Sequence, residues 1–343
     1  MLYYYALLYY NINLKQIKTM KKIHLISTLI GLLVFSTISK ADLKVVTSIK
    51  PIHSLASYIM DGVGSPRLIV DGYNSPHSFQ LKPSHAKMLE QADIIFWIGE
   101  DLENFLEKPL ATIAKKAEKI ELLEIKGIKK LKFRERNIFE EHEGHDDHGD
   151  DAKKEEHDDH GHDAKKEEHD DHEGHGHGEY DPHIWLDPIN AKVILNEITE
   201  HLIENDSKNA ATYKSNLAKA LAEIDKLIID VITETNTDLN YVVFHDAYQY
   251  YENRFNVNIL GAMTVNPDVM PGAEQIHEIH EVIEHDNVNC ILSEPQFNPD
   301  IIKSIAKDTS VKTGVLDPLG ANLKPGKNLY FDLIRNMSAS FNC

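Results

Sequence analysis

The sequence predicts an α/β protein in which a long helix connects two halves, and three observations support this fold class. Short β-branched or apolar runs alternate with amphipathic runs along most of the chain, which is typical of α/β architecture. An apolar stripe of helical period spans about residues 209–235, between the halves, and favours a rigid connector. The 343 residues suffice for two domains with sizeable cores, and 42% hydrophobic residues fit a globular protein.

The first half of the chain contains four strand-like runs with helix-like runs between them. The residues Pro51 and Pro83 stand at the beginning of two of the helical runs, where a missing backbone N–H costs nothing. Strands are predicted at 43–49, 67–70, 93–98 and 119–125, and helices at 52–60, 83–92 and 101–114.

The rest of the chain contains two consecutive helices and then a second alternating half. The first of these helices is predicted at 189–205, and in the second, at about 209–235, apolar residues recur every three or four positions. The resulting domains are a lobe at 42–188, a helical segment at 189–238 and a lobe at 239–343. The last lobe has strands predicted at 241–244, 257–260, 289–293 and 312–316, and helices at 247–255, 272–284, 299–307 and 328–340.

The N-terminus has the pattern of a secretory signal peptide over residues 1–41. Two lysines precede the apolar stretch 23–38, and small residues occupy the positions that precede cleavage after Ala41. Met20, just before the lysines, is a candidate for the true start. The mature chain is then exported, and the alternative is an N-terminal membrane anchor.

A low-complexity insert at about 136–180 carries most of the charge. The whole chain has 36 basic and 55 acidic side chains and a net charge of −19, of which −14 lies between residues 140 and 179. This balance excludes a nucleic-acid partner, which requires a basic face. We expect the metal-free insert to be disordered and its imidazoles to bind metal weakly, the alternative being a solvating linker. The ten imidazoles belong to His142, His145, His148, His157, His160, His162, His169, His172, His175 and His177.

Two cysteines are too few for thiolate zinc fingers or iron–sulfur clusters, which need about four such ligands. In an oxidising compartment Cys290 and Cys343 have a use as a disulfide. The alternative is a pair of buried thiols without a bond between them.

Four side chains stand between strand-like runs and turns: His77, His183, His245 and Asp317. Because ligands of open α/β sheets bind at the carboxyl ends of strands, these side chains are candidates for one site between the halves. Three imidazoles and a carboxylate form a tetrahedral zinc shell. The alternative for each His is a local hydrogen-bonding group. His201 is predicted to be ordinary helix surface.

Five motifs give the chain a resemblance to a known family. They are 75–84 (SPHSFQLKPS), 183–188 (HIWLDP), 243–248 (VFHDAY, with Phe255), 293–297 (SEPQF) and 316–320 (LDPLG). In this order they resemble the metal-binding solute-binding proteins of ABC importers (cluster A-I), most closely the zinc-specific, ZnuA-type branch. The resemblance covers nearly the whole mature chain and implies two α/β lobes joined by a long rigid helix.

The resemblance also implies which residues bind the metal. It makes His77, His183 and His245 ligands of Zn²⁺, and places His245 where manganese-specific relatives have Glu. Some zinc members have an acidic residue at the position of Pro76, so Asp317 becomes the candidate fourth ligand, with water as its competitor. Glu294 is expected to orient an imidazole or a contact between the lobes.

The implied function is capture of Zn²⁺ in the periplasm and its delivery to an ABC permease in the inner membrane, with a cytoplasmic ATPase. The acidic insert matches the His-rich loop of zinc members, and Cys290 and Cys343 match a disulfide that some of them have. We expect a monomer that catalyses no reaction. The alternatives are a manganese or iron component of a related importer and a zinc hydrolase.

Overall fold

The computed structural model describes residues 43–134, 136–139, 178–267, 269–307 and 309–343. The predicted signal peptide and insert residues 140–177, with all ten of the insert's histidines, lie outside the described residues. Residues Leu43–Cys343 form one compact unit. Each helix and strand predicted for this unit is present, with ends that differ by a few residues. The α/β prediction is therefore confirmed.

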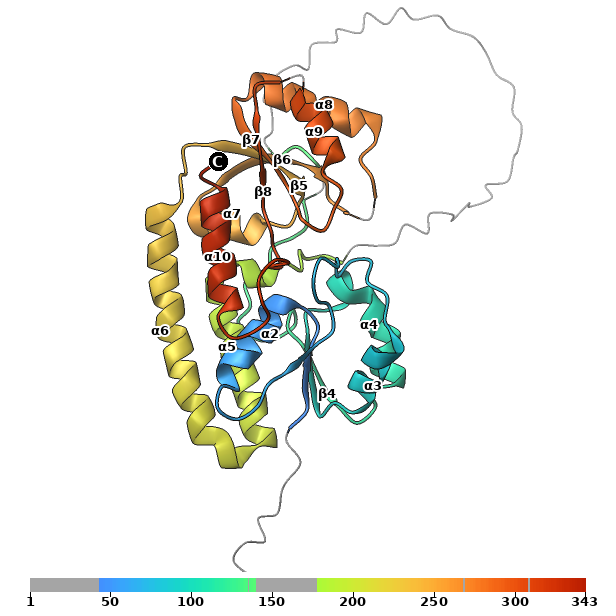
Figure 1. The fold of residues 1–343 in the computed structure, drawn as a ribbon, viewed down its shortest axis with the longest axis vertical. Coiled ribbons are helices and arrows are strands. Elements are labelled where there is room, and N and C mark those ends of the chain that lie inside the picture. The colour runs from blue at the N-terminus through green and yellow to red at the C-terminus, as the bar shows by residue number, and fades with distance from the viewer. Residues whose placement is uncertain (1–42, 135, 140–177, 268, 308) are drawn as a thin grey trace, which may run out of the picture. The chain divides into compact units, whose positions relative to one another are not determined.

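The first sheet has four parallel strands in the order β2-β1-β3-β4, with helices between consecutive strands (Figure 1). Every side chain of its central strand β3 is buried. A parallel strand covered on both faces needs such a continuous apolar run, which explains why these strands were visible in the sequence. The elements are β1 (Val45–Thr47), α2 (Lys50–Ile59), β2 (Arg67–Leu68), α3 (Pro83–Glu90), β3 (Ile94–Trp97), α4 (Glu100–Thr112) and β4 (Glu118–Glu121).

The second sheet repeats this plan with parallel strands in the order β6-β5-β7-β8. Strand β6 runs four residues past its predicted end, through Gly261. A Cβ at Gly261 would lie 2.7 Å from the backbone oxygen of Asn137, so glycine permits the chain to pair there. The elements are β5 (Asn240–His245), α7 (Gln249–Phe255), β6 (Asn258–Thr264), α8 (Ala273–His285), β7 (Val288–Ser293), α9 (Asp300–Lys307) and β8 (Lys312–Val315).

The described ends of the predicted insert belong to the fold. Residues 137–139 pair antiparallel with β6, where the N–H of Phe139 donates to Leu260 O at 2.8 Å. Tyr180 forms an antiparallel bridge with Lys132. The insert is thus shorter at both ends than the predicted 136–180. At its first end the insert is shorter because Ile138 and Phe139 are apolar and pack against the cores.

Two long helices, α5 (Pro188–Asn205) and α6 (Ala210–Glu234), connect the sheets and pack against each other. Asp187 caps α5, since its side chain accepts a hydrogen bond from the N–H of Ile189 at 2.9 Å. Two 3-10 turns, η1 (Ile184–Leu186) and η2 (Ser207–Asn209), precede them. Within the described part of the chain, no helix has both the length and the apolar character that crossing a membrane requires.

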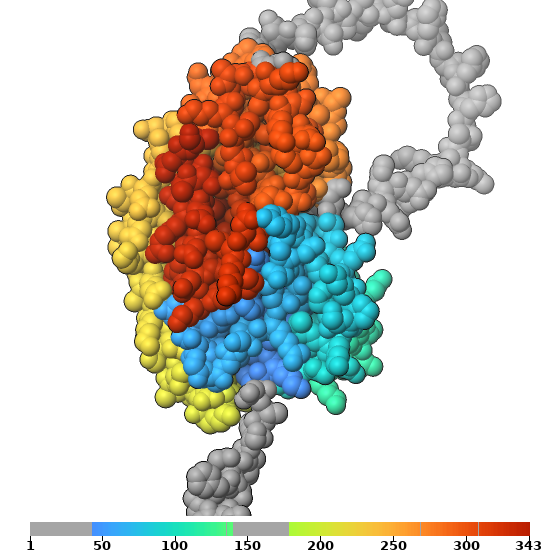
Figure 2. All heavy atoms as spheres, in the orientation of Figure 1, coloured from blue at the N-terminus to red at the C-terminus, as the bar shows by residue number. Residues whose placement is uncertain are grey.

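The last helix, α10 (Leu329–Ser340), contacts α2 and α6, although the sequence groups it with the second lobe. Figure 2 shows this C-terminal segment lying across both halves of the molecule. Its inner face is fully buried in the larger core, which includes side chains of both sheets. Lys50 and Ser54 of α2 hold the segment: Lys50 Nζ donates to Leu323 O at 2.8 Å, and Ser54 Oγ accepts from Tyr330 N at 2.9 Å.

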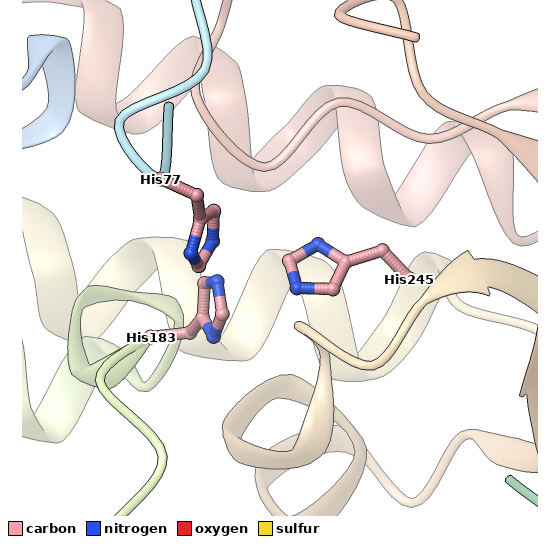
Figure 3. Close-up of side chains that lie close together, drawn as sticks. All are labelled: His77, His183 and His245. Atoms are coloured by element: carbon pink, nitrogen blue, oxygen red, sulfur yellow. The ribbon is translucent and has the colours of Figure 1, made fainter. Parts of the chain in front are cut away.

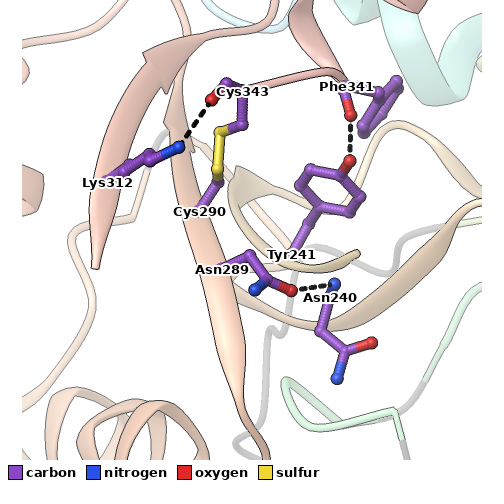
Figure 4. The surroundings of a disulfide bond; sticks show 7 residues. All are labelled: Asn240, Tyr241, Asn289, Cys290, Lys312, Phe341 and Cys343. Atoms are coloured by element: carbon purple, nitrogen blue, oxygen red, sulfur yellow. Dashed lines mark hydrogen bonds between the residues drawn. A yellow bond between two sulfur atoms is a disulfide. The ribbon is translucent and has the colours of Figure 1, made fainter. Parts of the chain in front are cut away.

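A disulfide between Cys290 and Cys343 fixes the chain end to β7 (Figure 4). The residues lie 53 positions apart, and closing a loop of this length stabilises the fold by about 4 kcal/mol in the chain-entropy model. Around it, Lys312 Nζ donates to Cys343 O at 3.1 Å, and the Tyr241 hydroxyl donates to Phe341 O. The predicted pairing is confirmed, and the alternative of two unbonded thiols is wrong.

Glu103 of α4 is a fully buried carboxyl group whose ionisation opposes folding. Its Oε2 accepts from the N–H groups of Ile98 and Gly99 at 2.8 and 3.1 Å. Burial raises the pKa of Glu103 to about 7. The folded chain therefore keeps this proton to a higher pH than the unfolded chain, so stability falls as pH rises from about 4.5 to 7.

The substitution Glu103→Gln is expected to flatten this pH dependence. The amide oxygen still accepts from the backbone, while the buried charge is removed. At pH 8 the variant should be more stable by roughly 3 kcal/mol, with no difference below pH 4.5. Urea unfolding across this pH range measures the effect, and Glu107→Gln, at an exposed site on the same helix, is the control. Parallel pH profiles for all three chains would show that Glu103 titrates normally.

Candidate metal centre

Three imidazole rings from distant parts of the chain converge at one point (Figure 3). Potential ligand atoms of His77, His183 and His245 all lie within 4.8 Å of one another. The ring centroids are 5.6 Å apart for His77 and His183, 5.1 Å for His77 and His245, and 5.0 Å for His183 and His245. His183 and His245 are each 2% exposed, and His77 is half-buried. Three nitrogen donors thus face one small space.

Only one of the three rings stands at the end of a sheet strand. His245 is the last residue of β5, at its carboxyl end. His77 lies nine residues beyond β2, in a loop where its N–H donates to Ser75 Oγ at 3.2 Å. His183 precedes the turn η1. The prediction that each ring directly follows a strand is therefore wrong for His77 and His183. Both residues lie in long connections outside the strands, and these connections place their rings next to His245 at the end of β5.

Asp181 fixes the ring of His183. Its Oδ1 lies 2.7 Å from His183 Nδ1 and also accepts the backbone N–H of His183 at 2.9 Å. Asp181 is 1% exposed. A carboxylate on Nδ1 fixes the tautomer and orientation of the ring and leaves Nε2 to a metal ion. Asp181 was not among the predicted site residues, although an acid two residues before a candidate ligand is a usable signal in the sequence.

Glu294 and Tyr248 support the ring of His245 from the second sheet. Glu294 Oε1 lies 3.3 Å from His245 Nδ1, the neighbour expected of a residue that orients an imidazole. The hydroxyl of Tyr248 donates to the same oxygen at 2.9 Å. Burial, together with the charge of Glu294, raises the pKa of Tyr248 well above its usual value. Tyr248 therefore stays neutral and remains a donor.

Arg134 lies behind the site, between two buried carboxylates. Its Nη1 is 2.8 Å from Asp246 Oδ1, and its Nη2 is 2.6 Å from Glu252 Oε2. Burial raises the pKa of Glu252 to about 7 and also raises the pKa of Asp246, while Arg134 opposes both shifts. Asp246 directly follows His245, so this ion-pair cluster fixes the backbone beside a candidate ligand. Nothing in the sequence pattern pointed to Arg134.

Asp317 is not brought together with the imidazoles. Its carboxylate accepts backbone N–H groups from Leu319, Gly320 and Ala321 at 3.0, 2.9 and 2.6 Å. Gly320 has a φ of +69°, the left-handed conformation that closes this turn and favours glycine. Gln296 Nε2 also donates to Asp317 Oδ1, at 3.2 Å. In this arrangement Asp317 stabilises its own turn, whereas it was the predicted candidate for the fourth metal ligand.

We expect Asp317→Ala to lower the stability of the chain more than its affinity for Zn²⁺. Loss of an acceptor for three backbone N–H groups should cost about 1–3 kcal/mol of unfolding free energy. The dissociation constant for Zn²⁺ should change less than about tenfold, below the effect of removing a direct ligand. Urea unfolding and competition with a chelator measure the two quantities. Asp300→Ala, which removes an exposed carboxylate 3.3 Å from Lys303, is the control. A loss of affinity above 100-fold would make Asp317 the fourth ligand.

The space between the rings is small, with a volume of about 10 Å³, close to that of one water-sized sphere. Apolar side chains form much of its wall and limit access of water. Neutral imidazole nitrogens suit Zn²⁺ better than Mg²⁺ or Ca²⁺, which prefer oxygen. The lining residues are Ser75, Pro76, His77, His183, Trp185, His245, Glu294, Gln296, Phe297, Pro318 and Leu319.

The fold has two sheets of parallel strands joined by long helices, and both halves of the chain contribute histidines to one centre. These features define a metal-binding solute-binding protein. The description of the matching family model is ZnuA, zinc-uptake complex component A, periplasmic, and it covers residues 45–342. The chain belongs to this family. Its members are solute-binding proteins and not enzymes, so the zinc hydrolase alternative is wrong.

A curated relative agrees with this membership, and solved structures share the fold. The high-affinity zinc uptake system protein ZnuA of Brucella abortus (strain 2308) is 46% identical over 304 residues, which cover 86% of this chain and 90% of the relative. A crystal structure of ZnuA matches with a TM-score of 0.66 at 21% identity, covering 87% of this chain and 99% of that one. A zinc-bound ZnuA deletion mutant (138-173) matches with a TM-score of 0.64 at 21% identity, covering 87% and 98%.

Proposed function

We propose that His77, His183 and His245 bind one Zn²⁺ in the periplasm, and that the chain delivers this ion to an ABC permease in the inner membrane. Family membership makes the chain the zinc-binding component of an ABC importer, whose ATPase powers transport. The observation that carries the assignment of residues is the approach of three imidazoles to within 4.8 Å. We further propose that it acts as a monomer.

Zinc, more than manganese or iron, fits the donor set. The three candidate ligands are all nitrogen donors, whereas manganese sites are richer in carboxylate and water. Because the Asp317 carboxylate already accepts several hydrogen bonds, we propose that water completes the tetrahedron. Asp181 and Glu294 then act through the rings of His183 and His245 and do not touch the ion.

Release of the ion requires that the rings move apart. His77 lies on a loop of the first half and His245 on β5 of the second, so a change in their separation breaks the shared coordination. His77 is the most exposed of the three rings, so its loop is the part of the site that we propose to move. We propose that docking on the permease shifts this loop or the lobe that carries it.

The His-rich insert is proposed to concentrate zinc near the site. Deletion of residues 141–177 is expected to leave one tight Zn²⁺ per chain and to remove only weaker binding. Isothermal titration calorimetry of the two chains measures both classes of site. A chain whose ten insert histidines are replaced by Asn is the matched control, because it keeps the acidic charge and loses the imidazoles. Absence of a tight site in the deletion variant would show that the insert itself holds the transported ion.

A further inference from the structure

A second group of metal-ligating side chains lies far from the three-histidine centre. Potential ligand atoms of Glu118, His201 and Glu204 all lie within 4.8 Å of one another. Glu118 is the first residue of β4, and the other two lie on α5. His201 is 13 residues along α5 from Pro188, which places it about 20 Å from the end of the helix nearest His183. The group is therefore independent of the transport site.

Both nitrogens of the His201 ring face carboxylates. Nδ1 lies 2.8 Å from Glu118 Oε1, and Nε2 lies 3.1 Å from Oε1 of Glu197, one helical turn earlier. The ring packs edge-on against Phe96, and its side chain is 19% exposed. A neutral imidazole has one N–H, so it cannot donate to both carboxylates. One of the two contacts then places a lone pair against a negative oxygen.

Either a proton on the ring or a bound cation relieves this opposition, and a cation also accounts for the approach of Glu204 to the same point. Nδ1 of His201 is buried and, despite its short distance to Glu118, makes no hydrogen bond. In the part of the chain that the structure describes, no Lys or Arg forms an ion pair with Glu118, Glu197 or Glu204. Three carboxylates around one imidazole thus have no basic counter-charge except the ring itself.

The geometry points to a divalent-cation site formed by Glu118, His201 and Glu204. One imidazole and two carboxylates are ligands that Zn²⁺ accepts, and the remaining coordination positions go to water. The exposed side chain of Glu204 gives the ion access from solvent. Such an ion links the beginning of β4 to the last turns of α5. It stabilises the first lobe and takes no part in delivery of the transported zinc.

Anomalous diffraction at the zinc edge tests the site directly. Crystals of the mature chain are grown with about 0.1 mM Zn²⁺, a concentration well below the millimolar range. We expect one anomalous peak among Glu118, His201 and Glu204 besides the peak at the transport site. The second peak should disappear in His201→Gln and in Glu204→Gln. The Glu204 variant alters an exposed side chain and is not expected to disturb folding. His277→Gln is the control, because His277 is an exposed ring 3.5 Å from a single carboxylate, Glu281.

Equilibrium dialysis against micromolar Zn²⁺ gives the matching solution measurement. Each of the two variants should bind one ion fewer per chain than the unaltered protein, while the control binds the same number. Absence of the second peak, equal numbers of bound ions, or a peak that requires millimolar Zn²⁺ would each overturn the proposal. The transport-site peak reports separately on the proposed function.

Discussion

Replacement of any one of His77, His183 and His245 by Ala is expected to weaken Zn²⁺ binding by more than about 100-fold. Loss of a residue that only hydrogen-bonds to a metal ligand already lowers metal affinity by about 10–100-fold. Each substitution removes one of three nitrogen donors, and no other imidazole is among the residues that line the small, largely apolar space. Water fills the gap but is a weaker ligand than imidazole. The two remaining rings then bind the ion with incomplete coordination.

Competition with a zinc chelator of known affinity measures these losses on the metal-free chain. His277→Ala is the control, because it removes an imidazole from an exposed face of α8. Circular dichroism of the metal-free variants checks that the fold is retained. If all three single variants bind Zn²⁺ as tightly as the unaltered chain, the transport site lies elsewhere.

Replacement of Arg134 by Ala is expected to lower the free energy of unfolding by about 3–5 kcal/mol. The guanidinium is 21% exposed and is paired with Asp246 and Glu252, which are 4% and 10% exposed. Its removal leaves two buried carboxylates without their counter-charge. Arg134 also packs on the ring of Phe139 at 3.8 Å, so apolar contact is lost as well.

The cost of Arg134→Ala should depend on pH. The pKa of Glu252 is already raised to about 7 by burial, and loss of the guanidinium raises it further. Below that pH Glu252 can take up a proton in the folded variant and lose its charge. The difference in unfolding free energy between variant and unaltered chain should therefore be larger at pH 8 than at pH 5.5.

Urea unfolding of the metal-free chains at these two pH values measures the effect. Lys226→Ala is the matched control, because Lys226 forms an exposed pair with Asp230 at 2.7 Å on α6, and such a pair contributes less than about 1 kcal/mol. Equal destabilisation by the two substitutions would mean that Asp246 and Glu252 are solvated after all and do not need Arg134.

The parts of the fold that the sequence revealed are those with a strong local pattern. Strand β3 is a continuous buried apolar run, and α6 carries one apolar stripe along its whole length. Such periodicity is a property of neighbouring residues, so no knowledge of the tertiary structure is needed to see it. By contrast, β6 was expected to end at Leu260 but continues through Gly261, where the backbone of Asn137 lies close and a glycine is needed.

The sequence pointed to the three imidazoles and to Glu294 beside them, but not to the other side chains around the candidate site. His77, His183 and His245 could be selected from the motifs around them, and the structure brings them together. Of their partners, Asp181 stands two residues before His183, a spacing that could have pointed to it, whereas nothing in the sequence pattern marks Arg134 as a buried base. Asp317 has the right chemistry for a ligand, but its position after a strand and before Gly320 also makes it a turn acceptor.

The sequence by itself determined the order of helices and strands, the three imidazoles and the concentration of charge in one insert, because these are properties of residue type and local period. Only the tertiary structure decided that α10 packs against α2 and α6, that Arg134 pairs with two buried acids, and that His201 meets Glu118. Each of these contacts joins residues far apart along the chain. Their energies come from burial and charge pairing, which depend on the completed packing and leave no periodic trace in the sequence.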